Sequence, residues 1–287
     1  MVTFIDGLSL GAIYALIALG YTMVYGIAKM LNFAHGDIIM VGAYAIYAVL
    51  AVSGSPVVAM IAALILCTVL GIVIEKLAYK PLRGASPLAV LITAIGVSYL
   101  LQGVAQLIFG ADQKTVSILD KLGNVHIGEY SVKISSIITL ICGAIIMAGL
   151  TLFVKKTRTG RAMLAVSEDK AAAQLMGVNV NTIIMITFAI GSALATFASL
   201  FYLPTTSISP TLGSMPGIKA FAAAVIGGIG SIPGAMLGGV LLGLIENICL
   251  SIEAVASYTT AIEFGFLILI LMIRPIGLLG KKRRVKV

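Results

Sequence analysis

A short polar stretch between two apolar segments carries the residue types most able to do chemistry. Asn32, His35 and Asp37 lie within six residues, with Gly36 among them. Ionisable groups are costly at membrane depth, and where they occur there they usually serve a function. The alternative is an ordinary polar loop in which Asp37 caps the next helix, and composition alone does not separate the two interpretations. No nucleophile or metal-ligand partner accompanies these residues, so we expect neither a catalytic site nor a metal site here.

A second stretch is rich in glycine. Gly228 and Gly230 belong to the sequence Gly-Gly-Ile-Gly-Ser at residues 227–231, which interrupts an apolar segment. A break in the backbone at membrane depth is tolerated only where protein or a wet cavity covers it, so such a break points toward a pathway. Further glycines recur at small-xxx-small spacing, which predicts closely packed helices. These are Gly234, Gly238, Gly239 and Gly243.

The third stretch, residues 160–179, is the longest basic loop between apolar segments. Asp169 can cap a short alanine-rich helix, and Gly177 can end it. A short helix held out from a membrane can seat in a groove on a soluble partner. Taken alone, a surface turn without a partner is the simpler interpretation.

Motifs for enzymatic chemistry are missing from the sequence. Gly280-Lys281 is the only Gly-Lys pair, and Lys282 follows it where a Walker A loop needs Ser or Thr. Neither H-E-x-x-H nor G-x-S-x-G occurs, and the three cysteines have no metal-ligand spacing. We therefore expect no enzymatic activity, no metal and no cofactor bound by this chain.

The elements that position these stretches are apolar helices. Of the 287 residues, 60% are hydrophobic and 10% are charged, whereas soluble domains average about 25% charged residues. No water-soluble fold has enough interior to bury so much apolar side chain. The composition excludes a soluble enzyme, a nucleic-acid-binding domain and a disordered regulator, and it predicts an all-α polytopic membrane protein.

Runs without charge give the expected spans, at about 20 residues for each crossing. We expect about eight transmembrane helices, some of them broken or re-entrant. Their expected ranges are 4–26, 36–52, 56–75, 87–109, 134–154, 183–203, 218–250 and 256–273. The seventh is too long for one crossing, so we expect a short helix or re-entrant arm, a break and then a full span.

The basic residues predict the orientation. The net charge is +8, and most of the 19 basic residues fall in three segments, at 76–83, 155–170 and 274–287. Cytoplasmic loops carry such an excess, so we place these segments in the cytoplasm. Counting spans backward then puts the N-terminus outside.

Three motifs in order resemble those of the branched-chain amino acid ABC importer permeases of the LivH type. They are the run at residues 11–20 followed by Asn-Phe-Ala-His-Gly at 32–36, the loop at 160–179, and the glycine segment at 227–239. The loop is similar to that family's EAA loop, with Ala172-Ala173 followed by Gly177. One departure is that Ala171 stands where a glutamate is expected, and Glu168 lies three residues earlier.

The resemblance implies an ABC importer permease fold in one transmembrane domain, residues 1–287. A cytoplasmic coupling loop would span 155–182 and a basic cytoplasmic tail 274–287. The implied partners are a second homologous permease, two cytoplasmic ATPase subunits that bind ATP and Mg²⁺, an extracytoplasmic solute-binding protein and membrane lipid, with no nucleic acid. The expected location is the bacterial cytoplasmic membrane. The implied coupling residues are Gly160, Arg161, Glu168, Asp169, Ala172, Ala173 and Gly177.

The implied activity is import of leucine, isoleucine and valine by alternating access. Relatives with similar signatures carry urea or short amides, which leaves those solutes as an alternative. An ion-coupled secondary transporter would need carboxylates deep in the bundle, and its candidates are Asp37, Glu246, Glu253 and Glu263. A membrane scaffold or enzyme has no supporting motif. The expected pathway residues are Asn32, His35, Gly36, Asp37, Gly228 and Gly230.

Overall fold

Long apolar helices form the body of the protein in this computed structural model, which describes residues 2–119, 122–127 and 130–280. Seven helical segments of this described part are long and apolar enough to cross a membrane. Their helices are α1 (Val2–Ala28), α2 (His35–Ser53), α3 (Pro56–Ile74), α4 (Pro87–Phe109), α5 (Ile134–Lys156), α8 (Val180–Tyr202) and α10 (Ile232–Ser251). This arrangement confirms the predicted all-α polytopic class, although the count of eight is not confirmed.

Shorter elements connect or interrupt these spans. Two apolar helices, α9 (Ser214–Gly227) and α12 (Thr259–Ile273), are shorter than a full crossing. The predicted break in the seventh segment is confirmed, because α9 ends at Gly227 and α10 begins at Ile232. The remaining elements are the π-helix η1 (Glu75–Tyr79), the 3-10 helices η2 (Lys80–Leu82) and η4 (Leu203–Thr205), the helices α6 (Arg158–Glu168), α7 (Lys170–Leu175) and α11 (Glu253–Ala256), and the antiparallel strands β1 (Asn124–Ile127) and β2 (Tyr130–Lys133).

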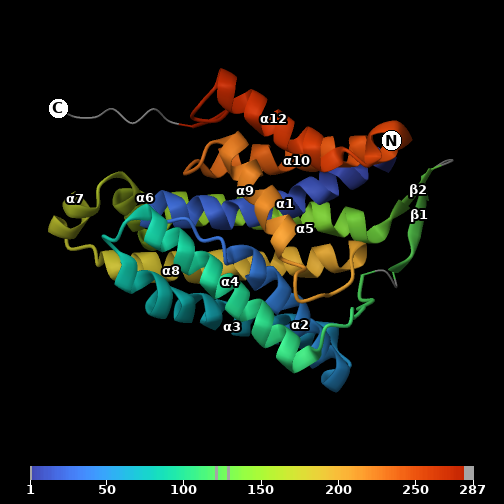
Figure 1. Cartoon of the computed structure of the whole chain (residues 1–287), viewed down its shortest axis with the longest axis horizontal. Helices are drawn as coiled ribbons and strands as arrows, with labels where there is room; N and C mark the ends of the chain where they lie inside the picture. Colours follow the sequence, from blue (N-terminus) through green and yellow to red (C-terminus); the bar gives the residue numbers. More distant parts are fainter. Residues whose placement is uncertain (1, 120–121, 128–129, 281–287) are drawn as a thin grey trace.

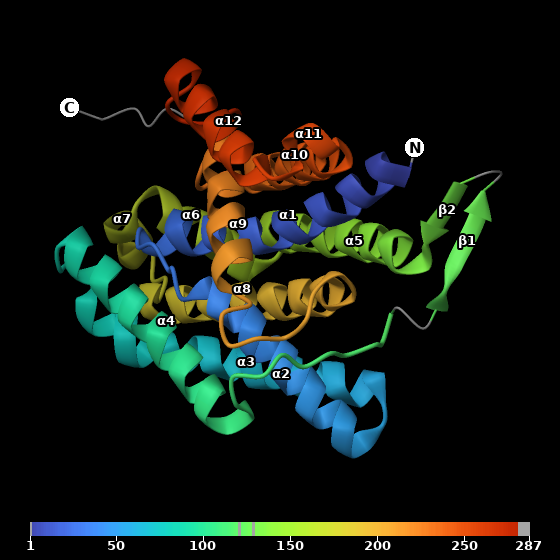
Figure 2. The same cartoon turned by 45° about the vertical axis from the view of Figure 1, so that its right-hand side comes forward.

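The long helices α1, α5, α8 and α10 run side by side, and α9 crosses them (Figures 1 and 2). The α3–α4 link, α6 and α7 lie at one end of the bundle, while the start of α1 and the β1–β2 hairpin lie at the other. Two of the three basic segments, 76–83 and 155–170, therefore lie at the same end of the bundle, as the charge pattern predicts. Residues 281–287 of the predicted basic tail lie outside the described residues.

Helix α1 is the centre of the fold, buried around its whole circumference from Gly11 to Val24. A helix that is apolar on every face belongs inside a protein or a membrane. Its closest neighbour is α10, where a Cβ on Gly239 would overlap the backbone of Ala15 and one on Gly243 would overlap the backbone of Gly11. The close packing predicted from the small-xxx-small spacing is thus confirmed.

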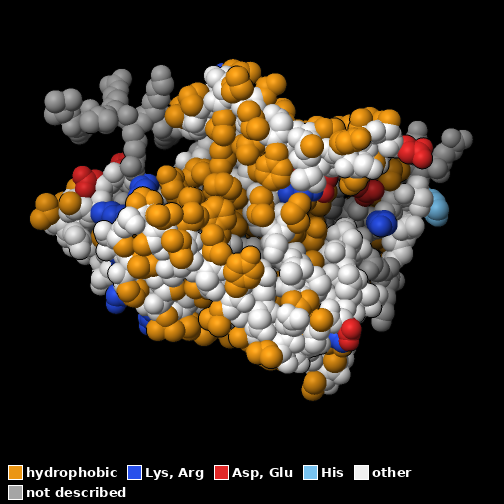
Figure 3. All heavy atoms as spheres, viewed as in Figure 1, with side chains coloured by type: hydrophobic (Ala, Val, Ile, Leu, Met, Phe, Trp, Pro, Cys, Tyr) orange, Lys and Arg blue, Asp and Glu red, His pale blue; other side chains and the backbone are white. Residues whose placement is uncertain are grey.

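The outside of the bundle is apolar. Large hydrophobic side chains are exposed along α3, α4 and α12, among them Ile65, Ile92 and Leu269. Figure 3 shows hydrophobic side chains covering much of the visible face, with several Lys and Arg side chains toward the end where α6 and α7 lie. An apolar surface of this extent requires lipid or protein to cover it, which agrees with a multi-pass membrane protein.

Candidate transport pathway and coupling surface

The polar stretch at 32–37 is folded into the bundle. Asn32, His35 and Asp37 are each only 1–2% exposed. Helix α2 begins at His35, so Asp37 is its third residue and does not cap it. The alternative, a polar surface loop in which Asp37 caps the next helix, is therefore wrong.

Asn32 and His35 are held by three different helical elements. The hydroxyl of Tyr79, in η1, donates a hydrogen bond to Asn32 Oδ1 at 2.8 Å. The His35 ring packs edge-on against Tyr21, with ring centroids 4.9 Å apart. It occupies space that any side chain at Gly20 of α1 would fill, and Gly191 of α8 lies beside it. The two glycines thus make room for an imidazole between α1 and α8.

Asp37 belongs to a polar cluster shared by three helices. Its Oδ1 accepts a hydrogen bond from Gln102 Nε2 of α4 at 2.8 Å. The same Nε2 lies 3.3 Å from Ser98 Oγ, also of α4, and 3.3 Å from Ser214 Oγ at the start of α9. Asp37 is buried, whereas Gln102, Ser98 and Ser214 are half-buried. This cluster offers one carboxylate together with amide and hydroxyl groups, which suits a small solute that carries an ammonium group.

Gly36 brings the starts of α2 and α9 together. A Cβ at Gly36 would overlap the carbonyl oxygen of Gly213 and lie 3.0 Å from Gly217 Cα. Both neighbours are backbone and cannot move aside as a flexible side chain can. The requirement for glycine at this position is therefore one of clearance, which places Ser214 next to Asp37.

A buried ionic cluster joins α9 to three other helices, namely α1, α10 and α12. Lys219 Nζ donates to Glu246 Oε1 of α10 at 2.7 Å and lies 3.2 Å from Glu263 Oε2 of α12. Tyr14 of α1 donates through its hydroxyl to Glu246 Oε2 at 2.7 Å. Glu253, by contrast, is exposed. Two of the four carboxylates considered for ion coupling are therefore paired with a fixed cation.

Sequence reasoning named both glutamates but missed Lys219 as their partner. The signal was present, because Lys219 is the first charged residue after the long uncharged run that follows Lys170. A lone lysine in an apolar helix has to find a carboxylate partner, because an unpaired charge is too costly there.

The glycine break is covered by residues 276–280, which follow α12. Gly228 and Gly230 have positive φ angles of 106° and 92°, which favour glycine. The amides of Leu278 and Leu279 donate to the carbonyls of Ile226 and Gly227 at 2.8 and 2.9 Å. Protein therefore satisfies the last carbonyls of α9, as a break at membrane depth requires.

Gly228 and Gly230 lie away from the cluster around Asp37. A Cβ on Gly228 would meet the backbone of Gly280, and one on Gly230 would lie 3.9 Å from Gly26 Cα near the end of α1. The structure thus does not bring all the predicted pathway residues together. It separates them into a polar cluster and a break beside the predicted coupling loop.

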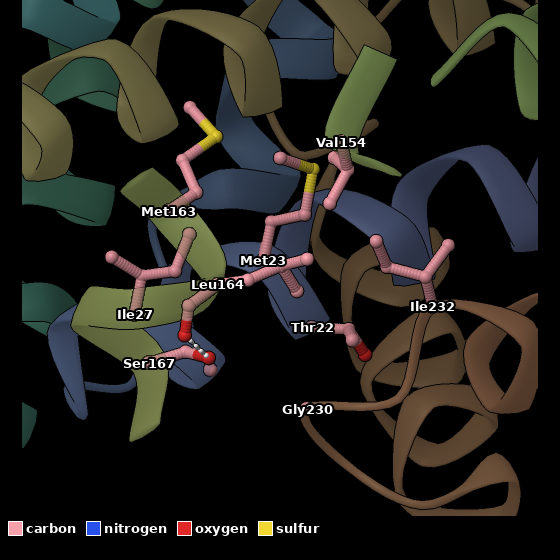
Figure 4. A pocket seen from close by; sticks show the side chains of 10 residues that line it. Thr22, Met23, Ile27, Val154, Met163, Leu164, Ser167, Gly230 and Ile232 are labelled. Carbon is pink, nitrogen blue, oxygen red and sulfur yellow. Dashed lines mark hydrogen bonds between the residues drawn. The ribbon is translucent and has the colours of Figure 1, made fainter. Parts of the chain in front are cut away.

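A small cavity marks the junction between this break and the loop. It has a volume of about 40 Å³ and is lined mainly by side chains of α1 and α6, with Gly230 and Ile232 at its edge. In the close-up, Met23 of α1 and Met163 and Leu164 of α6 surround it (Figure 4). Flexible methionines around a gap allow side chains to repack, so α6 has room to shift against α1.

Both predicted ends of the short loop helix are confirmed. Asp169 Oδ1 accepts hydrogen bonds from the amides of Ala171 and Ala172 at 2.8 and 3.0 Å, which caps α7. Gly177 has a φ of 82°, and the amide of Val178 donates to the carbonyl of Ala173 at 3.0 Å. This is the Schellman arrangement for ending a helix with glycine.

The predicted coupling residues divide by burial. Gly160 and Ala173 are buried in the packing of α6 and α7, whereas Arg161, Glu168 and Ala172 are exposed. Sequence reasoning missed the two most exposed apolar side chains of this loop, Leu175 and Met176, which are 89% and 84% exposed at the end of α7. Two large apolar side chains at the tip of a polar loop are typical of an interaction site.

The comparisons with known proteins decide the family. Residues 3–272 match the family model described as "Branched-chain amino acid transport system / permease component". The chain belongs to this permease family. The permease is 43% identical to the high-affinity branched-chain amino acid transport system permease protein BraD of Pseudomonas aeruginosa, over 99% of this chain and 96% of that protein. It is 39% identical to LivH of Escherichia coli K12, over 98% of this chain and 96% of that one. The resemblance found in the sequence motifs is confirmed.

Proposed function

We propose that this permease carries leucine, isoleucine and valine inward across the bacterial cytoplasmic membrane as one subunit of an ATP-driven importer. The observation that supports it most is the similarity to BraD and LivH, which extends over nearly the whole length of each chain. The exposed apolar flanks of the helix bundle are also consistent with a multi-pass subunit that needs lipid and a second permease around it.

The polar cluster around Asp37 is the proposed contact for the solute's backbone. A branched-chain amino acid carries an ammonium, a carboxylate and an apolar side chain. Asp37 can accept from the ammonium, and Gln102 can donate to the carboxylate. Tyr21 and Phe33 each pack against Phe221, near the middle of α9, with ring centroids 5.9 and 5.3 Å apart. That group provides an apolar surface for the solute's side chain.

The proposed coupling starts at the loop of α6 and α7. Leu175 and Met176 would seat in a groove of a cytoplasmic ATPase subunit, and ATP with Mg²⁺ would bind to the ATPases rather than to this chain. Lys170 of α7 donates to the carbonyl of Ala28 at 2.8 Å, which ties the loop to the end of α1. A movement of α7 would thus pull on α1, and α1 carries Gly20 against His35.

The test is uptake of labelled leucine by the assembled complex reconstituted in vesicles. The complex contains this permease, its second permease, the two ATPases and the binding protein. We expect uptake that requires ATP, is unaffected by collapse of ion gradients, and is competed by isoleucine and valine. Uptake driven by an ion gradient without ATP would contradict the importer, and competition by urea or acetamide alone would contradict the solute.

A further inference from the structure

A cavity opens at the end of the bundle that carries α6 and α7. Its volume is about 390 Å³, and it lies between the end of α1, the α3–α4 link and the first turn of α4. Three basic residues line it, namely Lys29, Arg83 and Lys170, and no acidic residue is among the described residues of its wall. Most of the remaining wall is apolar, including Leu82 and Val90. Positive charge and apolar surface are therefore combined in one hollow.

Each basic side chain comes from a different part of the chain. Lys29 follows α1, and among the described residues it is the only one other than glycine with a positive φ, at 60°. Glycine adopts that conformation more readily than any other residue. The backbone conformation alone therefore does not explain a lysine at this position, whereas a role for the lysine side chain would explain it.

Arg83 and Lys170 add positive charge to the wall of the cavity. Arg83 pairs with the buried carboxylate of Glu75, yet its Nε is buried without a hydrogen-bond partner in the part of the chain that the structure describes. Burial, together with the nearby charge of Arg83, lowers the pKa of Lys170. A bound anion would relieve this repulsion.

We propose that this cavity binds the phosphate of an anionic phospholipid. The ends of membrane-spanning helices lie at the depth of the lipid headgroups, and basic pockets between helices at the cytoplasmic side bind such headgroups. From the cavity, Leu91 leads to the exposed side chains of Leu88 and Ile92 on the same outer part of α4. An acyl chain can lie along this surface. A free phosphate would use the charges but leave the apolar path empty.

The test measures lipid binding to the purified, delipidated full chain in a neutral detergent by native mass spectrometry. The probes are phosphatidylglycerol and phosphatidylcholine with identical acyl chains. Lys29→Gln combined with Lys170→Gln removes two cations from the cavity. We expect the affinity for phosphatidylglycerol to fall about 25-fold, at roughly fivefold for each lysine, while binding of phosphatidylcholine stays unchanged.

The matched control is Lys76→Gln combined with Lys80→Gln. Both lysines are exposed in the neighbouring link and do not line the cavity, so we expect affinity within twofold of the unmodified chain. An equal loss in both double variants would mean that charge at this end acts without a site, and it would overturn the proposal. No loss in either variant would overturn it as well.

Two further arms separate charge from packing and lipid from soluble phosphate. Lys29→Arg combined with Lys170→Arg keeps both charges, so it should bind phosphatidylglycerol like the unmodified chain. If it loses binding as fully as the Gln variant, the cavity does not act through charge. Inorganic phosphate and glycerol 3-phosphate should compete only weakly, and displacement of the lipid by either at equal concentration would contradict a lipid site.

Discussion

Replacing Lys219 by methionine should strongly destabilise the permease. The variant leaves two carboxylates without their shared cation. Glu246 keeps the hydroxyl of Tyr14 at 2.7 Å, whereas Glu263 loses the hydrogen bond that Lys219 donates to it at 3.3 Å. Breaking a buried ion pair by removing one partner costs about 3–5 kcal/mol. We expect a loss in this range, and most of it should arise at Glu263.

A variant that removes all three charges separates this penalty from lost packing. Lys219→Met combined with Glu246→Gln and Glu263→Gln leaves no buried ion unpaired, so the penalty for an uncompensated buried charge, which arises when only one partner is removed, no longer applies. We expect it to recover at least half of the loss.

The measurement is the free energy of unfolding of the full chain in detergent. The chain has no tryptophan, so far-ultraviolet circular dichroism during titration with sodium dodecyl sulfate is the suitable signal. A loss below about 0.5 kcal/mol for Lys219→Met, which is the range of ordinary surface changes, would refute the reasoning. So would a triple variant as unstable as the single one.

Three further predictions concern transport. Gly177→Val should lose uptake and copurification with the ATPase, because a positive φ costs a β-branched residue about 1 kcal/mol or more. No atom lies within 4 Å of a Cβ added at Gly177, so there is space for a side chain. Gly177→Asn should therefore keep most activity, because asparagine tolerates that φ. Asp37→Asn should lower leucine uptake at least tenfold at unchanged amounts of assembled complex, and uptake within twofold of normal would remove Asp37 from the pathway. Leu175→Ser combined with Met176→Ser should abolish copurification with the ATPase while leaving membrane insertion intact, and normal copurification would contradict their role as the docking contact.

Much of the fold could be predicted from the sequence, because its cause is local. The free energy of placing apolar side chains in lipid depends on runs of residues, so most of the spans and the break at 228–231 follow from hydropathy and glycine alone. The caps of α7 follow in the same way from Asp169 and Gly177. The late start of α12 could not be predicted in this way, because residues 253–258 form α11 and the turn that follows it.

The site could be predicted only in part, because its partners are distant in sequence. Nothing near Asp37 in the chain indicates Gln102 or Ser214, and nothing near Lys219 indicates Glu263. Such pairs arise when helices cross, and their angle depends on packing against the whole bundle. The exposure of Leu175 and Met176 was also hidden, since apolar residues at the end of a short helix are as compatible with burial as with docking.

Close contacts at glycines lie along α1 between the polar cluster and the predicted coupling loop. Gly36 needs clearance from backbone, so loss of uptake in Gly36→Leu would follow from overlap with Gly213 alone and would not distinguish a pathway residue from a packing residue. Asp37 is the sharper probe, because its carboxylate can be changed to an amide of nearly the same size. The same logic applies along α1, where Gly20 faces His35 and Gly26 faces Gly230. Because these two contacts lie on one continuous helix, the proposed pull on its end through Lys170 and Ala28 would move both. Uptake should therefore be lost when the hydrogen bond from Lys170 to Ala28, which links α7 to α1, is removed. No residue proposed to contact the solute is changed in such a variant.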